Sequence, residues 1–201
     1  TGQSLRDFAK KNIFDVLGMR HTDYLATIQQ KDGKWINTVA YPWMDRIAPT
    51  ERQKDGSVLC GQVHDPLARI LNGGISGNAG VFSDANDMGI LAAALLNGGE
   101  YNGRRILSPP GVKTMCTVPR ELAGFGRTPG WDVSSPYASN KGDLFGPNTF
   151  GHTGYTGTSI IIDPDNDTAV ILLVNAVHPE DGHSVVRLRS LVANAVAASI
   201  C

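Results

Sequence analysis

The sequence predicts an α+β fold of the α/β sandwich type, in which an antiparallel sheet is covered by helices. Two apolar runs, residues 158–162 and 168–174, are separated by the turn-forming residues 163–167. This spacing favours a pair of antiparallel strands. Helical periodicity is present before the pair, in residues 88–96, and after it, in residues 188–196. A strand pair between two amphipathic helices is typical of a sheet that helices cover.

The first expected element is a helix that follows Ser4. Ser4 and Asp7 form a pattern similar to a capping box, and apolar residues continue at helical spacing as far as Leu17. Gly18 is expected to end the helix, because glycine enters the left-handed conformation at little cost. The chain opens at Thr1 without an initiator Met and almost directly with this helix. We therefore expect the chain to begin at an interior point of a larger protein.

The middle of the chain is less regular. Residues 31–34 predict a hairpin around an Asp-Gly turn. Residues 41–74 have little periodicity and contain three prolines, which favours a functional loop. Residues 73–80 contain four glycines, a density that indicates positive φ angles or close approach of backbones.

Three later helices have clear signals. Ser83 and Asp84 are expected to cap a helix whose apolar face is Met88, Leu91, Ala92, Leu95 and Leu96. Ser108-Pro109 predicts the start of a second helix. The last helix is predicted from a face formed by Leu188, Leu191, Val192, Ala195 and Val196.

Composition excludes several classes of function. The 201 residues carry 18 Lys+Arg against 19 Asp+Glu, a net charge of −1, and contain no basic run. We therefore expect no nucleic-acid partner and no binding to an anionic membrane surface. No apolar run reaches the ~18 residues of a membrane span. The three cysteines, Cys60, Cys116 and Cys201, are too few for a disulfide framework.

The most informative motif is residues 150–159, FGHTGYTGTS, where His152-Thr153-Gly154 directly precedes an apolar strand. The triplet is similar to the Lys-Thr-Gly motif of penicillin-recognising serine hydrolases. Residues 13–19, IFDVLGM, residues 63–66, VHDP, and residues 73–83, GGISGNAGVFS, also resemble segments of that family. Together with the NAVHP of residues 175–179, these segments cover nearly all of the chain. The chain resembles the serine β-lactamase-like hydrolases, which include class C β-lactamases, D-Ala-D-Ala peptidases and esterases.

The resemblance implies that residues 1–201 are the C-terminal part of a single domain with a β-lactamase/transpeptidase-like fold, whose N-terminal part is absent. It also implies acyl-enzyme chemistry on a β-lactam, a D-Ala peptide or an ester. The family's nucleophilic Ser lies in an S-x-x-K motif, and a Y-x-N motif assists it. This chain contains neither motif. The nucleophile is therefore expected upstream, and the isolated chain is expected to be inactive. The resemblance further implies export to the periplasm or the exterior, no cofactor, and a small-molecule or peptide substrate.

The expected substrate-binding residues are His152, Thr153, Gly154 and Tyr155. By resemblance, the Tyr155 N–H is one oxyanion donor, Thr153 offers a hydroxyl, and the small Gly154 and Gly157 let substrate lie along the strand. Histidine is largely neutral at pH 7, whereas lysine is a permanent cation. His152 therefore favours an ester or peptide substrate over a carboxylate-bearing β-lactam.

The alternative interpretation is a non-catalytic β-lactamase-like module that binds a peptide or another chain. Its open sheet edge predicts self-association. Ser76-Gly77-Asn78 fits the family's S-x-N motif, but we favour a turn in which Gly77 and Asn78 take positive φ. Gly74 to Asn78 lacks the last glycine of a nucleophile elbow. His64 and Asp65 are compatible with a local polar anchor, and no catalytic role is assigned to them.

No metal site is expected. Residues 163–174 begin like a calcium loop, but Thr168 stands where that loop needs Gly and Val174 where it needs Glu. His178 and His183 lack cysteine partners or a helix that would place them together.

Overall fold

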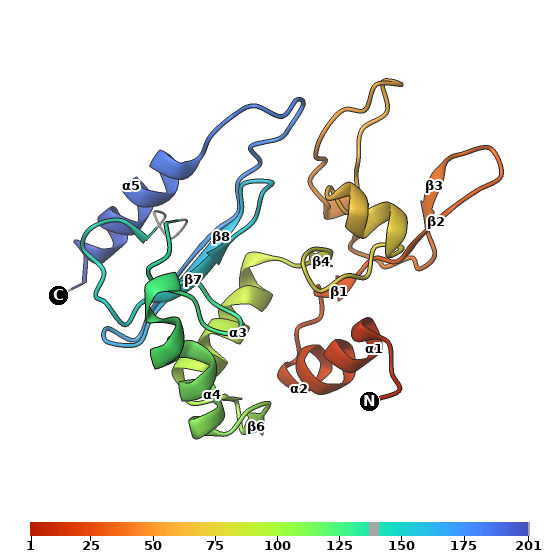
Figure 1. The fold of residues 1–201 in the computed structure, drawn as a ribbon. Helices are drawn as coiled ribbons and strands as arrows, with labels where there is room; N and C mark the ends of the chain where they lie inside the picture. Colours follow the sequence, from red (N-terminus) through yellow and green to blue (C-terminus); the bar gives the residue numbers. More distant parts are fainter. Residues whose placement is uncertain (137–140, 201) are drawn as a thin grey trace. The chain divides into compact units, whose positions relative to one another are not determined.

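The computed structural model of the chain describes residues 1–136 and 141–200, and Cys201 lies outside these residues (Figure 1). The chain forms two compact units. The first contains residues 1–87 and 177–182, and the second contains residues 88–176 and 183–201. Each unit is described below by itself.

The first unit opens with the predicted helix. It runs through α1 (Leu5–Ala9), the π-helical η1 (Lys10–Phe14) and α2 (Asp15–Leu17). The Ser4 hydroxyl accepts a hydrogen bond from the Asp7 N–H at 3.1 Å, as the capping pattern predicts. Gly18 has φ of 76° and ends the helix, so both predicted boundaries are confirmed.

Four short strands lie in the first unit. The predicted hairpin is confirmed, because β2 (Thr27–Gln29) and β3 (Trp35–Asn37) pair antiparallel across the 31–34 turn. β1 (Asp23–Tyr24) pairs antiparallel with β4 (Val81–Phe82), although 56 residues lie between them. Such long-range pairing leaves no local signal in the sequence.

The irregular region contains two short helices, η2 (Met44–Arg46) and the π-helical η3 (Leu67–Leu71). Five residues are too few to show a helical period, so the sequence does not predict η3. Its start is fixed by Asp65, whose carboxylate accepts the Ala68 N–H at 2.7 Å. Asp65 is thus the N-terminal cap of a helical turn.

Close packing of the backbone requires glycine within the segment 73–80. A Cβ on Gly74 would lie 2.6 Å from the carbonyl oxygen of Leu25, and a Cβ on Gly80 would lie 2.6 Å from that of Gly74. Both glycines have positive φ. The prediction of positive φ at Gly77 and Asn78 is wrong, since neither adopts it. The Asn78 side chain instead accepts a hydrogen bond from the Ser76 hydroxyl.

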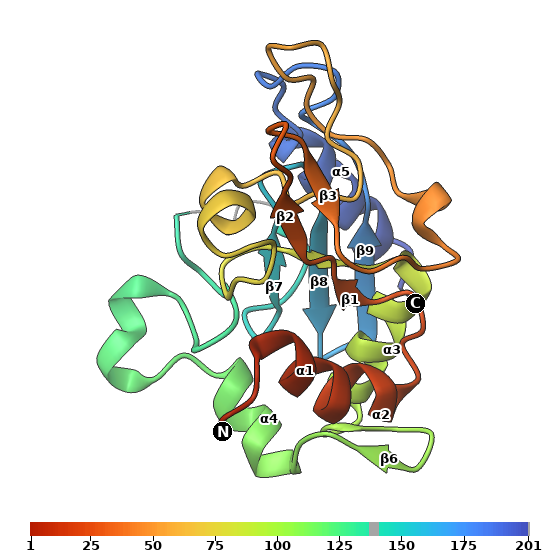
Figure 2. The same cartoon turned by 90° about the vertical axis from the view of Figure 1, so that its right-hand side faces the viewer.

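The second unit is built on a three-stranded antiparallel sheet of order β7–β8–β9 (Figure 2). The strands are β7 (Phe150–Thr153), β8 (Ser159–Asp163) and β9 (Thr168–Leu172). The predicted hairpin of β8 and β9 is therefore confirmed, with ends shifted by one or two residues. His152 lies opposite Ile160 in the register of β7 and β8.

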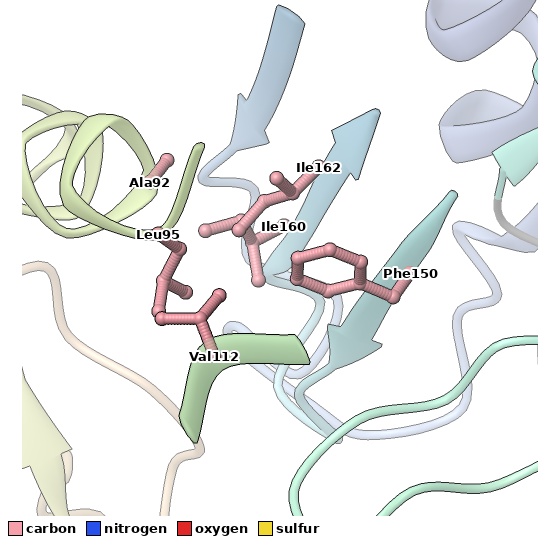
Figure 3. Packing of buried hydrophobic residues seen from close by; sticks show 6 residues of the cluster. All are labelled: Ala92, Leu95, Val112, Phe150, Ile160 and Ile162. Carbon is pink, nitrogen blue, oxygen red and sulfur yellow. The ribbon is translucent and has the colours of Figure 1, made fainter. Parts of the chain in front are cut away.

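Helices pack on both faces of this sheet, because alternate residues of β8 point in opposite directions. Ile160 and Ile162 join a core cluster with residues of α3 (Ala85–Leu96) and α4 (Pro109–Cys116), shown in Figure 3. Ile161 joins a second cluster with Ala193 of α5 (Val186–Ala197). The predicted sheet covered by helices is confirmed.

The two helices before the sheet follow their predicted caps. The Asp84 carboxylate accepts the Asp87 N–H at 2.9 Å at the start of α3. The Ser108 hydroxyl accepts the Gly111 N–H at 3.2 Å at the start of α4. Of the predicted α3 face, Ala92 and Leu95 are buried in the core, and Met88, Leu91 and Leu96 pack against it.

The prediction for the last helix is correct in place and wrong in part about its buried face. Leu188 and Leu191 are 42% and 55% exposed. Arg189 and Ala193 are the buried residues of α5, and Val192 and Val196 pack beside them. The helix is turned so that a charged residue, Arg189, lies on its buried face.

The remaining elements of the second unit are the hairpin strands β5 (Glu100–Tyr101) and β6 (Arg104–Arg105) and the 3-10 helix η4 (Arg120–Phe125). Among the helices of residues 1–136 and 141–200, none has the length and apolar character required to cross a membrane.

Candidate active site

The candidate site consists of His152 and Thr153 at the end of β7 and of Gly154 and Tyr155 in the turn that leads to β8. The turn is closed by the Gly154 N–H, which donates to Thr158 O at 2.7 Å, and by the Gly157 N–H, which donates to Gly154 O at 3.1 Å. The Ala176 N–H donates to Thr156 O at 2.7 Å and ties the turn to the segment after β9. Hydrogen bonds therefore fix this turn at three points.

Close contacts in the structure explain why the turn has glycine at two positions. A Cβ on Gly154 would lie 2.4 Å from Thr158 Oγ1. Gly157 has φ of 123°, and a Cβ there would lie 2.6 Å from the carbonyl oxygen of Val174. Glycine at these positions lets the turn fold tightly onto its own chain.

His152 and Tyr155 are exposed, and Tyr155 is 73% exposed. The His152 Nδ1 lies 2.9 Å from Thr153 O. A carbonyl oxygen can only accept, so this contact assigns the proton to Nδ1. In the neutral ring Nε2 is then a hydrogen-bond acceptor.

The outer edge of β7 is paired in part. The Asp132 N–H donates to Gly151 O at 2.8 Å, and the Gly151 N–H donates back to Asp132 O at 2.9 Å. A Cβ on Gly151 would lie 2.3 Å from Ile160 O, so only glycine fits here. The Asp132 carboxylate is buried and forms a 3.0 Å salt bridge with Arg127. These contacts hold the strand that leads into the turn.

Arg189 is a further residue of this site, and the sequence motifs do not predict its place there. Its side chain is buried, and its Nη2 donates to Gly154 O at 2.9 Å and to Thr158 O at 3.0 Å. Its Nε donates to Gly157 O at 3.1 Å. Burial lowers the pKa of this guanidinium. The helical spacing does indicate that Arg189 is buried. It lies three residues before Val192 and seven before Val196, which are in the buried stripe of the helix.

The other motif residues belong to the first unit. His64 Nε2 lies 3.2 Å from the Glu51 carboxylate, and Asp65 caps η3 as described above. Arg69 donates to Val63 O at 2.6 Å and to His64 O at 3.0 Å. His64 and Asp65 thus both make polar contacts within the first unit. His178 belongs to this unit and His183 to the other.

One cluster of the first unit has ligand-type side chains. Metal-ligating atoms of His21, Asp84 and Asp87 lie within 4.8 Å of one another. The Asp84 carboxylate, however, contacts His21 Nδ1 at 2.7 Å and Arg46 at 3.6 Å. Asp87 Oδ2 accepts hydrogen bonds from the His21 N–H and the Thr22 hydroxyl, both at 2.7 Å. These hydrogen bonds explain why the three side chains lie together, since they hold the residues at the start of α3.

Comparison with known proteins agrees with the motif. The family model described as Beta-lactamase matches residues 1–194. A relative from Escherichia coli K12, named putative D-alanyl-D-alanine carboxypeptidase, is 34% identical over 192 residues, which are 89% of this chain and 41% of the relative. The chain therefore spans about two fifths of the length of this curated relative.

Solved structures show the fold. A β-lactamase from Mycobacterium bovis matches with a TM-score of 0.60 at 20% identity, over 99% of this chain and 57% of the other. A penicillin-binding protein homologue from Caulobacter crescentus matches with a TM-score of 0.57 at 18% identity, over 98% of this chain and 53% of the other. Both comparisons place the chain in the β-lactamase/transpeptidase-like fold.

Proposed function

Because this chain belongs to the β-lactamase family, we propose that it is part of a serine hydrolase that works through an acyl-enzyme. Residues 1–201 are the C-terminal part of its catalytic domain, and the nucleophilic Ser and its Lys lie upstream. The chain itself contains no S-x-x-K and no Y-x-N motif. The family relative from E. coli is more than twice as long as the matched segment, which leaves room for both.

The observation that carries the proposal is the rigid turn at the end of β7. An acyl-transfer enzyme needs hydrogen-bond donors that are fixed before the reaction, because donors held in place stabilise the developing oxyanion without reorganising. The turn is closed by internal hydrogen bonds and by Arg189. In this role the Tyr155 N–H donates to the oxyanion, and Thr153 offers its hydroxyl to the substrate.

The substrate class that we propose is an ester or a peptide. In its neutral form, with the proton on Nδ1, His152 presents an acceptor at Nε2. An acceptor lone pair binds a hydroxyl or amide donor and repels a carboxylate, whereas a lysine would attract one. The relative's name, putative D-alanyl-D-alanine carboxypeptidase, makes a D-Ala peptide the first peptide to test.

The proposal is tested with the full-length product of the gene and with residues 1–201 alone. Both are incubated with a p-nitrophenyl ester, a D-Ala-D-Ala peptide and a fluorescent penicillin, and acylated peptides are mapped by mass spectrometry. We expect the full-length protein to hydrolyse the ester or the peptide and to be acylated at a Ser upstream of Thr1. We expect the 201-residue chain to remain unlabelled.

Two results would overturn the proposal. The first is a full-length sequence without S-x-x-K upstream of Thr1, together with no acylation. That result would favour the non-catalytic binding module instead. The second is acylation of a Ser within residues 1–201, because it would place the nucleophile inside this chain.

A further inference from the structure

Arg189 is a buried cation that is held by backbone carbonyls. It is 8% exposed, and within residues 1–136 and 141–200 no carboxylate forms a salt bridge with it. A buried charge without a partner is costly, so its three hydrogen bonds to carbonyl oxygens must stabilise it. All three oxygens belong to one turn, that of Gly154, Gly157 and Thr158.

The hydrogen bond to Gly154 has a consequence for the next residue. The C=O of Gly154 and the N–H of Tyr155 belong to the same peptide group. This peptide is trans, since the cis bond of the described chain is His178-Pro179. In a trans peptide the C=O and the N–H point in opposite directions. With Gly154 O directed at the guanidinium, the Tyr155 N–H is directed away from Arg189.

The cation also changes the strength of this donor. A positive charge on a carbonyl oxygen polarises the peptide, which makes its N–H a stronger hydrogen-bond donor. Arginine suits this task because its planar fork donates in several fixed directions at once. The second hydrogen bond of Nη2, to Thr158 O, holds the opposite side of the turn. Arg189 therefore both orients and polarises the peptide group between Gly154 and Tyr155.

We propose that Arg189 is a positioning residue, which sets the direction of the Tyr155 N–H by holding the Gly154 carbonyl. The catalytic consequence rests on the proposed function, in which that N–H meets the oxyanion. The orientation of the peptide does not rest on it. The inference therefore has one readout in the structure of the turn and a second in catalysis.

The test uses the full-length protein and three variants. Arg189→Met removes the charge and the donors, and Arg189→Lys keeps the charge on a single ammonium group. Arg187→Met is the matched control, because Arg187 is exposed on the same helix. Hydrogen–deuterium exchange is measured for the peptide that covers residues 153–160. The kcat and KM are measured with a p-nitrophenyl ester.

We expect Arg189→Met to accelerate amide exchange in the turn by about tenfold or more, because its closing hydrogen bonds open more often. We expect kcat to fall by about tenfold or more with KM changed less than about twofold, because an oxyanion donor acts mainly in the transition state. The exchange rate and kcat of Arg189→Lys should lie between those of the parent and those of Arg189→Met. Arg187→Met should match the parent in both measurements.

Each outcome decides the inference. A folded Arg189→Met protein with unchanged exchange or unchanged kcat overturns it. If Arg189→Met does not fold, the same criteria apply to Arg189→Lys. If the parent protein hydrolyses no substrate, the proposed function fails, and the exchange of residues 153–160 alone decides whether Arg189 holds the turn.

Discussion

At the scale of single residues, two buried arginines act on the backbone in the same way. Arg69 holds the carbonyls of Val63 and His64 in the first unit, and Arg189 holds the carbonyls of the β7–β8 turn in the second. Burial lowers the pKa of both guanidinium groups. A guanidinium has five N–H donors, so one side chain can satisfy several carbonyls that have no partner in a strand or helix.

The substitution His152→Lys tests substrate preference at one residue. A lysine supplies a permanent cation where neutral histidine supplies an acceptor. In the full-length protein we expect the ratio of kcat/KM for a carboxylate-bearing β-lactam to that for a neutral ester to rise by about tenfold, or ~1.4 kcal/mol. His183→Lys, the same change at an exposed residue of the same unit, is the control. An unchanged ratio would mean that His152 does not face the substrate.

The two cysteines of the described residues should differ in reactivity. Burial raises the pKa of the Cys116 thiol to about 11, so at pH 8 almost none of it is thiolate. Cys60 is exposed. Iodoacetamide at pH 8 should therefore alkylate Cys60 much faster than Cys116, and raising the pH should accelerate the reaction of Cys116. Peptide mapping at timed intervals measures both rates, and equal rates would contradict the partial burial of Cys116.

At the scale of elements, the β7–β8 turn depends on backbone shape more than on side chains. The family resemblance implies that Gly154 and Gly157 leave room for a substrate. The structure shows that both would clash with their own chain if they carried a Cβ. The tight turn also brings three carbonyls to one side, where α5 supplies Arg189. The helix and the turn are therefore joined by hydrogen bonds, although about thirty residues separate them in the sequence.

The substitution Gly157→Ala should destabilise this turn. Its φ of 123° is strained for alanine, and the new Cβ would lie 2.6 Å from Val174 O. We expect a loss of about 2 kcal/mol or more in the free energy of unfolding. Gly124→Ala is the control, since no atom lies within 4 Å of its Cβ and its φ is not positive. Denaturant titration of the full-length protein measures both, and equal losses would contradict the argument.

At the scale of the whole molecule, each compact unit contains its own set of motif residues. The glycine-rich segment 73–80 belongs to the first unit, and His152 to Tyr155 belong to the second. The second unit has β8 as its centre, with all five residues buried. Its two clusters lie on opposite faces of that strand. The stability of the turn that leads into β8 should therefore follow the stability of this core.

The substitution Ile162→Ala tests the core. Ile162 is fully buried, so its truncation leaves a cavity and should cost ~2–5 kcal/mol in the free energy of unfolding. Leu191→Ala removes a comparable side chain that is 55% exposed, and it should cost below about 1 kcal/mol. Denaturant titration of the two full-length variants compares them. A larger loss for Leu191→Ala would contradict the described orientation of α5.

The sequence by itself determines the helix caps at Ser4, Asp84 and Ser108, the hairpin of β8 and β9, and the motif at His152. These features depend on residues that are close in the chain, so spacing and residue type are enough to identify them. Only the tertiary structure decides the pairing of β1 with β4, the buried face of α5 and the hydrogen bonds from Arg189 to the turn. Each of these joins distant segments, and a local hydrophobic pattern cannot show that carbonyl oxygens of a turn will be the partners of a buried cation.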